Sequence, residues 1–372
     1  MRAEQSRAEQ SRAEQSRAEQ SRAEQRLDIR IIRVISMLSI VACHTIKYYT
    51  FIPASSLLGQ VFNVGVYSFF IISGYLYGKK DVGNLKTWYI KRIQKIHVPI
   101  IILTIIDIII LMAYFNQTFK ISTVIIYLMN LQGIQFISYW ISKPFFKEIT
   151  NLGPLWFATI IMLCYLQIPF LQKIREKYIA NKSSTWMIKY GVILTGAYVV
   201  AYIFEVNLVY FLVFDLGYMI SACLEEQVEN LSGKVRPYLK ALIWCVLGVA
   251  FQVGRIILHF IIDGTKTYEI YVSLSHFVFG ISIVMCIMNL YICFPGVMGK
   301  IANSRVIRYL DKQSYYIYIV HGIYCAGVTN VYERFGKYNI STVTLLFIIL
   351  VVVTAMILDK MTRVVLSIGN NY

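Results

Sequence analysis

The stretch Arg33-Val-Ile-Ser-Met-Leu-Ser-Ile-Val-Ala-Cys-His44 lies in an apolar segment, 28–51, that is long enough to cross a membrane. It carries a cation near one end and an imidazole eleven residues later. At about 100° per residue the two positions differ by only about 20° around a helix, and they lie roughly 16 Å apart along its axis. A titratable group that faces lipid is costly. We therefore expect Arg33 and His44 to line one wall of a polar cavity, which would be the active site.

The composition indicates a membrane protein. Of the 372 residues, 57% are hydrophobic and only 15% are charged, and the mean hydropathy is positive, which is too apolar for an ordinary soluble fold. The formal net charge of +16 does not predict a nucleic-acid partner, because most cations lie in short loops between apolar segments. The seven cysteines show no C-x-x-C spacing, so neither disulfides nor a metal site is expected. The predicted fold class is an all-α, polytopic membrane protein embedded in a lipid bilayer.

Apolar segments of spanning length recur along the chain, each near the roughly 20 residues that a bilayer requires. After the first, they lie at about 61–78, 98–115, 152–171, 186–204, 207–224, 239–262, 268–291, 313–331 and 343–362. With the first segment they predict about ten transmembrane helices around a central polar cavity. A shorter apolar segment, 121–131, fits a re-entrant or surface helix better than an additional span.

The distribution of cations predicts the topology. If the N terminus lies inside, eighteen lysines and arginines fall in or beside cytoplasmic loops and seven in outer loops. Cytoplasmic loops of membrane proteins carry such an excess. We therefore expect both termini in the cytoplasm, Arg33 near the inner surface and His44 in the outer half of the membrane.

The chain divides into three predicted parts. Residues 1–25 repeat Arg-Ala-Glu-Gln-Ser about five times, and a five-residue period spreads each residue type around a helix and leaves no apolar face. This tail is expected to be disordered or fraying, and it lacks the apolar core of a signal peptide. Residues 26–363 form the membrane domain, and 364–372 form a short cytoplasmic tail.

A basic segment, 88–99, precedes the third span. Its cations Lys91, Arg92 and Lys95 lie within about one helical turn of each other. One interpretation is an interfacial anchor that is attracted to anionic lipid. The other is a clamp for phosphate groups, and its location on the same side of the membrane as Arg33 supports this second interpretation.

Two further spans contain residues that allow a structural or a functional role. Ser73 and Gly74 lie in an aromatic helix, where small residues let helices approach closely. Trp156 lies at the outer start of the fourth predicted span, where tryptophan is a common interfacial anchor. Either Ser73 or Trp156 could instead line the cavity.

Charged and titratable side chains recur in the remaining spans. Asp215 and Arg255 lie on consecutive antiparallel spans, and we expect them to neutralise each other. Arg255 and His259 are four residues apart and share a helix face. His321 lies in the middle of a span, either as a hydrogen-bonded core residue or near the substrate.

The order of these motifs resembles acyltransferase family 3, integral membrane proteins that O-acetylate bacterial surface glycans. The family's typical motifs are an arginine and a histidine separated by ten residues, a Phe-Phe-x-x-Ser-Gly-aromatic-Leu helix, a basic Arg-x-x-Arg segment that ends in proline, a Leu-Trp-aromatic start to a middle span, and a late Ser-Tyr-x-x-Tyr-x-x-His. In this chain the first motif corresponds to Arg33 and His44, and the second to 69–76. The basic segment corresponds to Arg92-Ile-Gln-Lys95 and Pro99. The tryptophan motif corresponds to 155–157, and the last motif to Ser314, Tyr315, Tyr318 and His321. The resemblance covers about residues 26–363. The chain departs from the pattern at Lys95, where relatives usually have arginine, and it lacks the glutamate that many relatives carry after the tryptophan motif.

The resemblance implies ten spans and an O-acyltransferase in the bacterial cytoplasmic membrane. It would move an acyl group, acetyl in the expected case, from cytoplasmic acyl-CoA to a hydroxyl of an extracytoplasmic polysaccharide or a lipid-linked sugar. His44 and Arg33 would be the catalytic residues, with His44 as the base, and no metal is expected. The donor phosphates would bind Lys91, Arg92 and Lys95, and the candidate cavity-lining residues are Ser73, Trp156, Arg255, His259 and His321.

Two other function classes remain open. Ten spans with buried charges also describe a transporter or flippase for a glycan or lipid-linked precursor. Against this alternative, the spans contain no internal repeat and no paired interruptions by Gly or Pro in corresponding halves. A membrane partner or sensor without chemistry would leave the ordered motifs unexplained.

Overall fold

The computed structural model describes residues 27–78, 80–137, 149–181, 185–204, 206–221 and 236–369. Within these ranges the chain is helical and contains no strand, as the sequence predicts. The predicted tail, 1–25, lies outside the described residues.

Helices of spanning length and composition dominate the described residues. Seven are long and apolar enough to cross a membrane: Leu27–Tyr48, Ser55–Gly78, Leu85–Phe115, Thr150–Lys177, Pro237–Ile262, Lys266–Cys293 and Ile340–Ile368. Shorter apolar helices lie at Lys189–Ala201 and Val209–Met219. A further helix, α15, occupies Arg305–Cys325, within the ninth predicted span and the segment before it. The chain is therefore an all-α polytopic membrane protein, and its total of ten spans stays a prediction.

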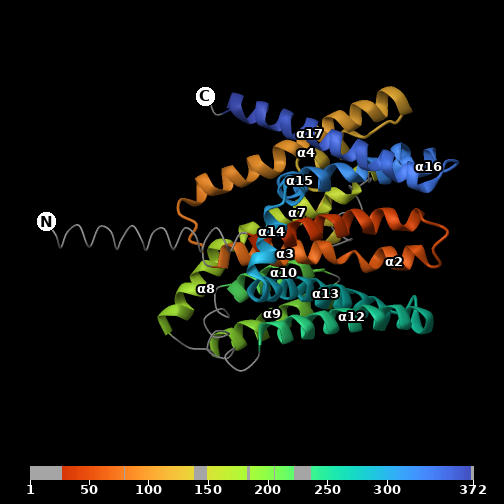
Figure 1. The fold of residues 1–372 in the computed structure, drawn as a ribbon. Helices are drawn as coiled ribbons and strands as arrows, with labels where there is room; N and C mark the ends of the chain where they lie inside the picture. The colour runs from red at the N-terminus through yellow and green to blue at the C-terminus, as the bar shows by residue number, and fades with distance from the viewer. Residues whose placement is uncertain are drawn as a thin grey trace, which may run out of the picture.

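The helices of the described residues form layers (Figure 1). Their bounds are α2 Ser55–Val61, α3 Val64–Gly78, α4 Leu85–Phe115, α5 Ile121–Leu128, α7 Trp156–Leu166, α8 Ile168–Asn181, α9 Thr185–Ile203, α10 Val209–Met219, α12 Pro237–Ile262, α13 Lys266–Cys293, α14 Pro295–Asn303, α15 Arg305–Cys325, α16 Val331–Arg334 and α17 Ile340–Gly369. Short 3₁₀ turns are η1 Ile46–Tyr48, η2 Gln132–Phe136, η3 Thr150–Leu155 and η5 Gly327–Thr329. Helices α12 and α13 pack together at one edge, α4 and α17 at the other, and α3, α10 and α15 lie between them.

Several element boundaries differ from the predicted ones for local reasons. The basic segment and the third span form one helix, α4, because the Asn84 side chain caps its N terminus by accepting from the Thr87 amide and the helix continues through Pro99. Helix α15 begins before residue 313 because Ser304 caps it. Helix α5 has eight residues and is about 12 Å long, too short to span, as predicted. Residues 364–369 of the predicted C-terminal tail continue helix α17.

Helices α3 and α10 pack backbone against backbone. A Cβ added to Gly74 would lie 1.9 Å from the Phe214 carbonyl oxygen, and one added to Gly217 would lie 2.0 Å from that of Ile71. Only glycine allows this approach, so the packing interpretation of the Ser73-Gly74 pair is confirmed for Gly74.

Candidate active site

The first helix, Leu27–Tyr48, runs beside α15 in the same direction. Three contacts join the two helices with a nearly constant offset of 277 or 278 positions: Arg33 to Asp311, His44 to His321, and Tyr48 to the Cys325 carbonyl. A constant offset over this length means that the helices are parallel and in register. As the spacing predicts, the cation and the imidazole of the first helix share a face, and that face meets α15.

An ion pair joins the first helix to α15 at the Arg33 end of this seam. The Arg33 Nε lies 2.9 Å from Asp311 Oδ1, and its Nη2 donates to Oδ2 at 3.1 Å. Arg30 approaches the same carboxylate at 3.6 Å and also donates to the Ala302 carbonyl. The guanidinium of Arg33 is therefore already engaged by the Asp311 carboxylate, a contact that the sequence did not predict. The available signal was one acidic residue in the otherwise basic segment before the ninth predicted span.

Two imidazoles meet at the other end of the seam. The ring centroids of His44 and His321 are 5.2 Å apart, and the ring planes make an angle of 44°. His321 is fully buried, whereas His44 is half-buried. The Nδ1 of His321 contacts the Tyr318 carbonyl one turn earlier on α15. The His321 ring is thus inaccessible and held by its own helix, whereas the His44 ring remains partly accessible.

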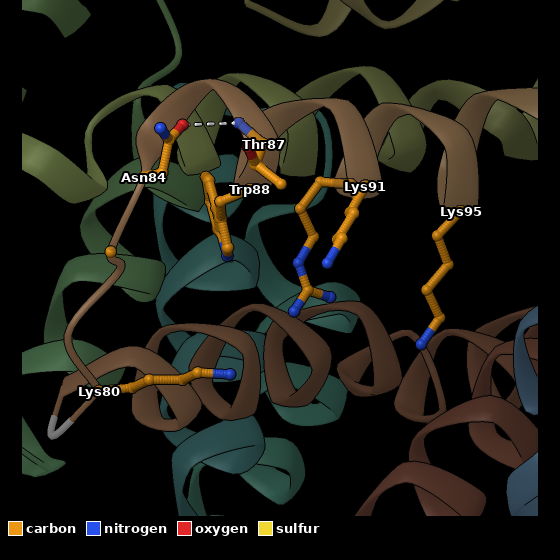
Figure 2. A pocket seen from close by; sticks show the side chains of 8 residues that line it. Lys80, Asn84, Thr87, Trp88, Lys91 and Lys95 are labelled. Carbon is orange, nitrogen blue, oxygen red and sulfur yellow. Dashed lines mark hydrogen bonds between the residues drawn. The ribbon is translucent and has the colours of Figure 1, made fainter. Parts of the chain in front are cut away.

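The three predicted phosphate-binding cations line one pocket. Its volume is about 480 Å³, and its lining comprises Lys80, Gly83, Asn84, Thr87, Trp88, Lys91, Arg92 and Lys95. Figure 2 shows Lys91 and Lys95 extending from one side of α4, and Lys80 reaching in from the segment that precedes the helix. Lys80 was not predicted to line this site, because it lies outside the basic segment 88–99.

Arg92 is held by aromatic rings. Its guanidinium carbon lies 5.4 Å from the ring centroid of Tyr77, 5.8 Å from that of Trp88 and 5.9 Å from that of Tyr165. Such contacts stabilise the cation without neutralising its charge. Lys95 interacts electrostatically with Arg92, Arg33 and Asp311. The basic pocket therefore lies next to the Arg33 end of the helix seam.

Ser73 and Trp156 have aromatic neighbours. Ser73 is half-buried and hydrogen-bonds to the Tyr165 hydroxyl. Trp156 stacks on Phe136, with ring centroids 4.6 Å apart, and its centroid lies 4.9 Å from that of Tyr210. These contacts support the packing of the helices, and cavity lining by either residue stays a prediction.

The predicted pairing of Asp215 with Arg255 is wrong. The two side chains have different hydrogen-bond partners: Gln167 and Tyr190 donate to Asp215, and Arg255 donates to Gln60, Gln252 and the Leu57 carbonyl. The prediction assumed that consecutive antiparallel spans pack together, but α10 packs against α3 while α12 packs against α13.

His259 lies toward the end of α12. Its Nδ1 is 3.3 Å from Asp263, one turn further on, and its ring centroid is 5.7 Å from that of Tyr268. Tyr268 also interacts with Arg255, in keeping with the predicted shared face. These contacts join neither residue to the pair formed by His44 and His321.

Among the described residues, no three His, Cys, Asp or Glu side chains lie close enough together to hold a metal ion. The chemistry that these residues can perform is acid–base chemistry at the histidine pair and anion binding in the basic pocket.

Comparison with known proteins identifies the family. No curated protein and no solved structure matches the chain. A family model described as an acyltransferase domain matches residues 26–359, nearly the whole chain. The chain is therefore a member of acyltransferase family 3 and a multi-pass membrane acyltransferase.

Proposed function

We propose that this acyltransferase moves an acyl group, acetyl in the expected case, from cytoplasmic acyl-CoA to a hydroxyl of a glycan at the outer face of the bacterial cytoplasmic membrane. The observation that carries the proposal is the register of the first helix with α15. The half-buried imidazole of His44 lies at one end of the seam, and the basic pocket lies next to the other end. A donor held in that pocket and an acceptor from the other side would meet at His44.

The basic pocket suits the phosphates of an acyl-CoA. Its volume of about 480 Å³ lies within the range typical of small-molecule sites. Lys80, Lys91 and Lys95 bring three ammonium groups to it, and Arg92 adds a planar guanidinium. The aromatic rings around Arg92 orient that group while its charge remains available to an anion.

His44 acts as the general base. Its neutral imidazole accepts the proton of the acceptor hydroxyl as the hydroxyl oxygen attacks the thioester carbonyl carbon. The carbon–sulfur bond then breaks, and the imidazolium returns the proton to the departing CoA thiolate. The base therefore ends the cycle neutral, and an ester and free CoA are the products.

Arg33 has a positioning role in this proposal. Its guanidinium is occupied by the Asp311 carboxylate, so the donor phosphates bind mainly to Lys80, Lys91, Arg92 and Lys95. The ion pair keeps the first helix in register with α15 and thereby places His44.

The experiment that tests the function uses sealed inside-out membrane vesicles loaded with surface polysaccharide and supplied with acetyl-CoA labelled in the acetyl group. Label in the polysaccharide is expected for the wild type, and His44→Ala should abolish it while the protein inserts and accumulates normally. A transporter would give no label in the glycan, and full activity of His44→Ala would remove His44 from the mechanism. Comparison of surface glycans from a deletion strain and its parent by NMR identifies the modified hydroxyl.

The donor site has its own test with a matched control. Lys91→Ala combined with Lys95→Ala should raise KM for acetyl-CoA by about tenfold, with a weaker dependence on salt, because two phosphate contacts are lost. Lys86→Ala is the control, because Lys86 is an exposed cation on the same helix that does not line the pocket. Equal KM values for the double variant and the control would refute the assignment of the pocket.

A further inference from the structure

A contact within α15 determines which ring nitrogen of His321 carries the proton. The Nδ1 of this ring lies against the Tyr318 carbonyl oxygen. A carbonyl oxygen can only accept, so Nδ1 must carry the proton. In the neutral ring the other nitrogen, Nε2, then presents a lone pair. Burial of the whole side chain disfavours the doubly protonated, charged form of the ring.

The Nε2 of His321 is an unsatisfied hydrogen-bond acceptor. It is buried, and among the described residues it has no hydrogen-bond partner. An acceptor in this condition costs free energy until a donor reaches it. Among the described residues, the rings that contact His321 are those of Tyr318 and His44. The Tyr318 hydroxyl already donates to the Pro154 carbonyl, which leaves His44 as the neighbour with an N–H to offer.

We propose that His321 is the positioning partner of His44: the Nε2 of His321 accepts a hydrogen bond from one ring nitrogen of His44 and so presents the other nitrogen of His44 to the acceptor hydroxyl. This inference rests on the proposed function and deepens it. The chain Tyr318 carbonyl, His321, His44 orients the base in the same manner as the third group of a catalytic triad, with a neutral imidazole in place of a carboxylate.

Only His44 gains and loses a proton during the reaction. His44 takes the hydroxyl proton on the nitrogen that faces the acceptor, while its other N–H remains bonded to His321. The resulting imidazolium is stabilised by that bond and returns the same proton to the CoA thiolate. His321 keeps its Nδ1 proton throughout and neither gains nor loses one.

The electrostatic surroundings make such a partner useful. Lys47 lies three residues after His44, so an imidazolium at His44 would form near an existing positive charge. Within the described residues no carboxylate forms an ion pair or a hydrogen bond with either ring, so the lone pair of His321 is the group available to stabilise the imidazolium.

The test compares two substitutions at His321. His321→Gln keeps an acceptor oxygen on a side chain of similar length, whereas His321→Leu removes the acceptor. We expect His321→Leu to lower kcat by about 100-fold with an unchanged KM for acetyl-CoA, and His321→Gln to recover at least about tenfold of that loss. The acid limb of the pH–rate profile should move to lower pH in His321→Leu, because the hydrogen bond that favours the imidazolium is lost.

A second buried histidine supplies the control. The Nε2 of His276 lies 2.9 Å from the Gln60 carbonyl, so His276→Leu also removes a buried side-chain contact to a backbone carbonyl. It should lower thermal stability to a degree similar to His321→Leu but leave the acid limb where it is. The same acid limb in wild type and His321→Leu, or equal activity of His321→Leu and His321→Gln, would overturn the inference.

A further measurement separates failure of this inference from failure of the proposed function. Diethyl pyrocarbonate modifies neutral imidazoles, and mass spectrometry of the peptide that contains His44 gives the rate of modification at each pH. The midpoint of that rate should shift to lower pH in His321→Leu, with no acyl donor present. If the wild type transfers no label from acetyl-CoA, the proposed function alone is refuted. If the midpoint of the pH dependence of His44 modification does not shift, the pairing of His44 with His321 is refuted.

Discussion

The ion pair between Arg33 and Asp311 can be separated into its structural and functional parts by a double-mutant cycle. The perturbations are Arg33→Ala, Asp311→Ala and the two together. The Arg33 Nη2 donates to the Asp311 carboxylate at 3.1 Å, and the Nε lies 2.9 Å from the other carboxylate oxygen without forming a hydrogen bond. The side chains of Arg33 and Asp311 are 38% and 15% exposed. The exposure of the Arg33–Asp311 pair is intermediate between that of a surface ion pair, which contributes about 0–1 kcal/mol, and that of a buried ion pair, whose disruption costs about 3–5 kcal/mol. We expect a coupling free energy of about 1–2 kcal/mol.

The assay is equilibrium unfolding in mixed micelles, with SDS as the denaturant and tryptophan fluorescence as the signal. Each single variant should lower the free energy of unfolding by about 2 kcal/mol, and the double variant should fall short of the sum by the coupling free energy. Single effects that add to within about 0.3 kcal/mol would refute the reasoning, because residues without shared contacts are additive to that degree.

The same four proteins decide what Arg33 does for activity. If Arg33 only holds the first helix in register with α15, the double variant should have the same KM for acetyl-CoA as Asp311→Ala alone. If Arg33 binds the donor itself, its removal should raise KM further even in the Asp311→Ala background. We expect the first result, because the ion pair with Asp311 already engages the guanidinium.

Two other predictions concern the packing around the site. Gly74→Ala should lower the free energy of unfolding by at least about 1–3 kcal/mol, because the new Cβ would lie 1.9 Å from the Phe214 carbonyl oxygen; Gly196→Ala, where nothing lies within 4 Å, should be neutral or slightly stabilising in the same titration. A Gly74→Ala protein as stable as wild type would contradict the close approach of α3 and α10. Tyr48→Phe removes the hydroxyl that donates to the Cys325 carbonyl at 2.9 Å and should lower the free energy of unfolding by about 1 kcal/mol and reduce kcat, since it loosens the seam one turn beyond His44. Unchanged kcat with reduced stability would show that this end of the seam does not position the base.

The sequence alone predicted the membrane class, the helical fold and the shared face of Arg33 and His44. Membrane spans are read from long apolar segments because lipid forces every backbone polar group to bond within its own helix. The common face follows from helix periodicity, which depends only on spacing along the chain. The cluster of Lys91, Arg92 and Lys95 is local in the same sense, and all three line one pocket.

Contacts between helices were decided by the tertiary structure. Asp311 and His321 lie 277 or 278 positions beyond the residues that they meet, and no local pattern states which two of many apolar helices will be neighbours. The same limit explains the wrong pairing of Asp215 with Arg255, which lie on consecutive predicted spans but have different hydrogen-bond partners. Periodicity determines which residues of one helix share a face. The steric fit among all the helices, such as the close approach at Gly74, determines which other helix that face contacts.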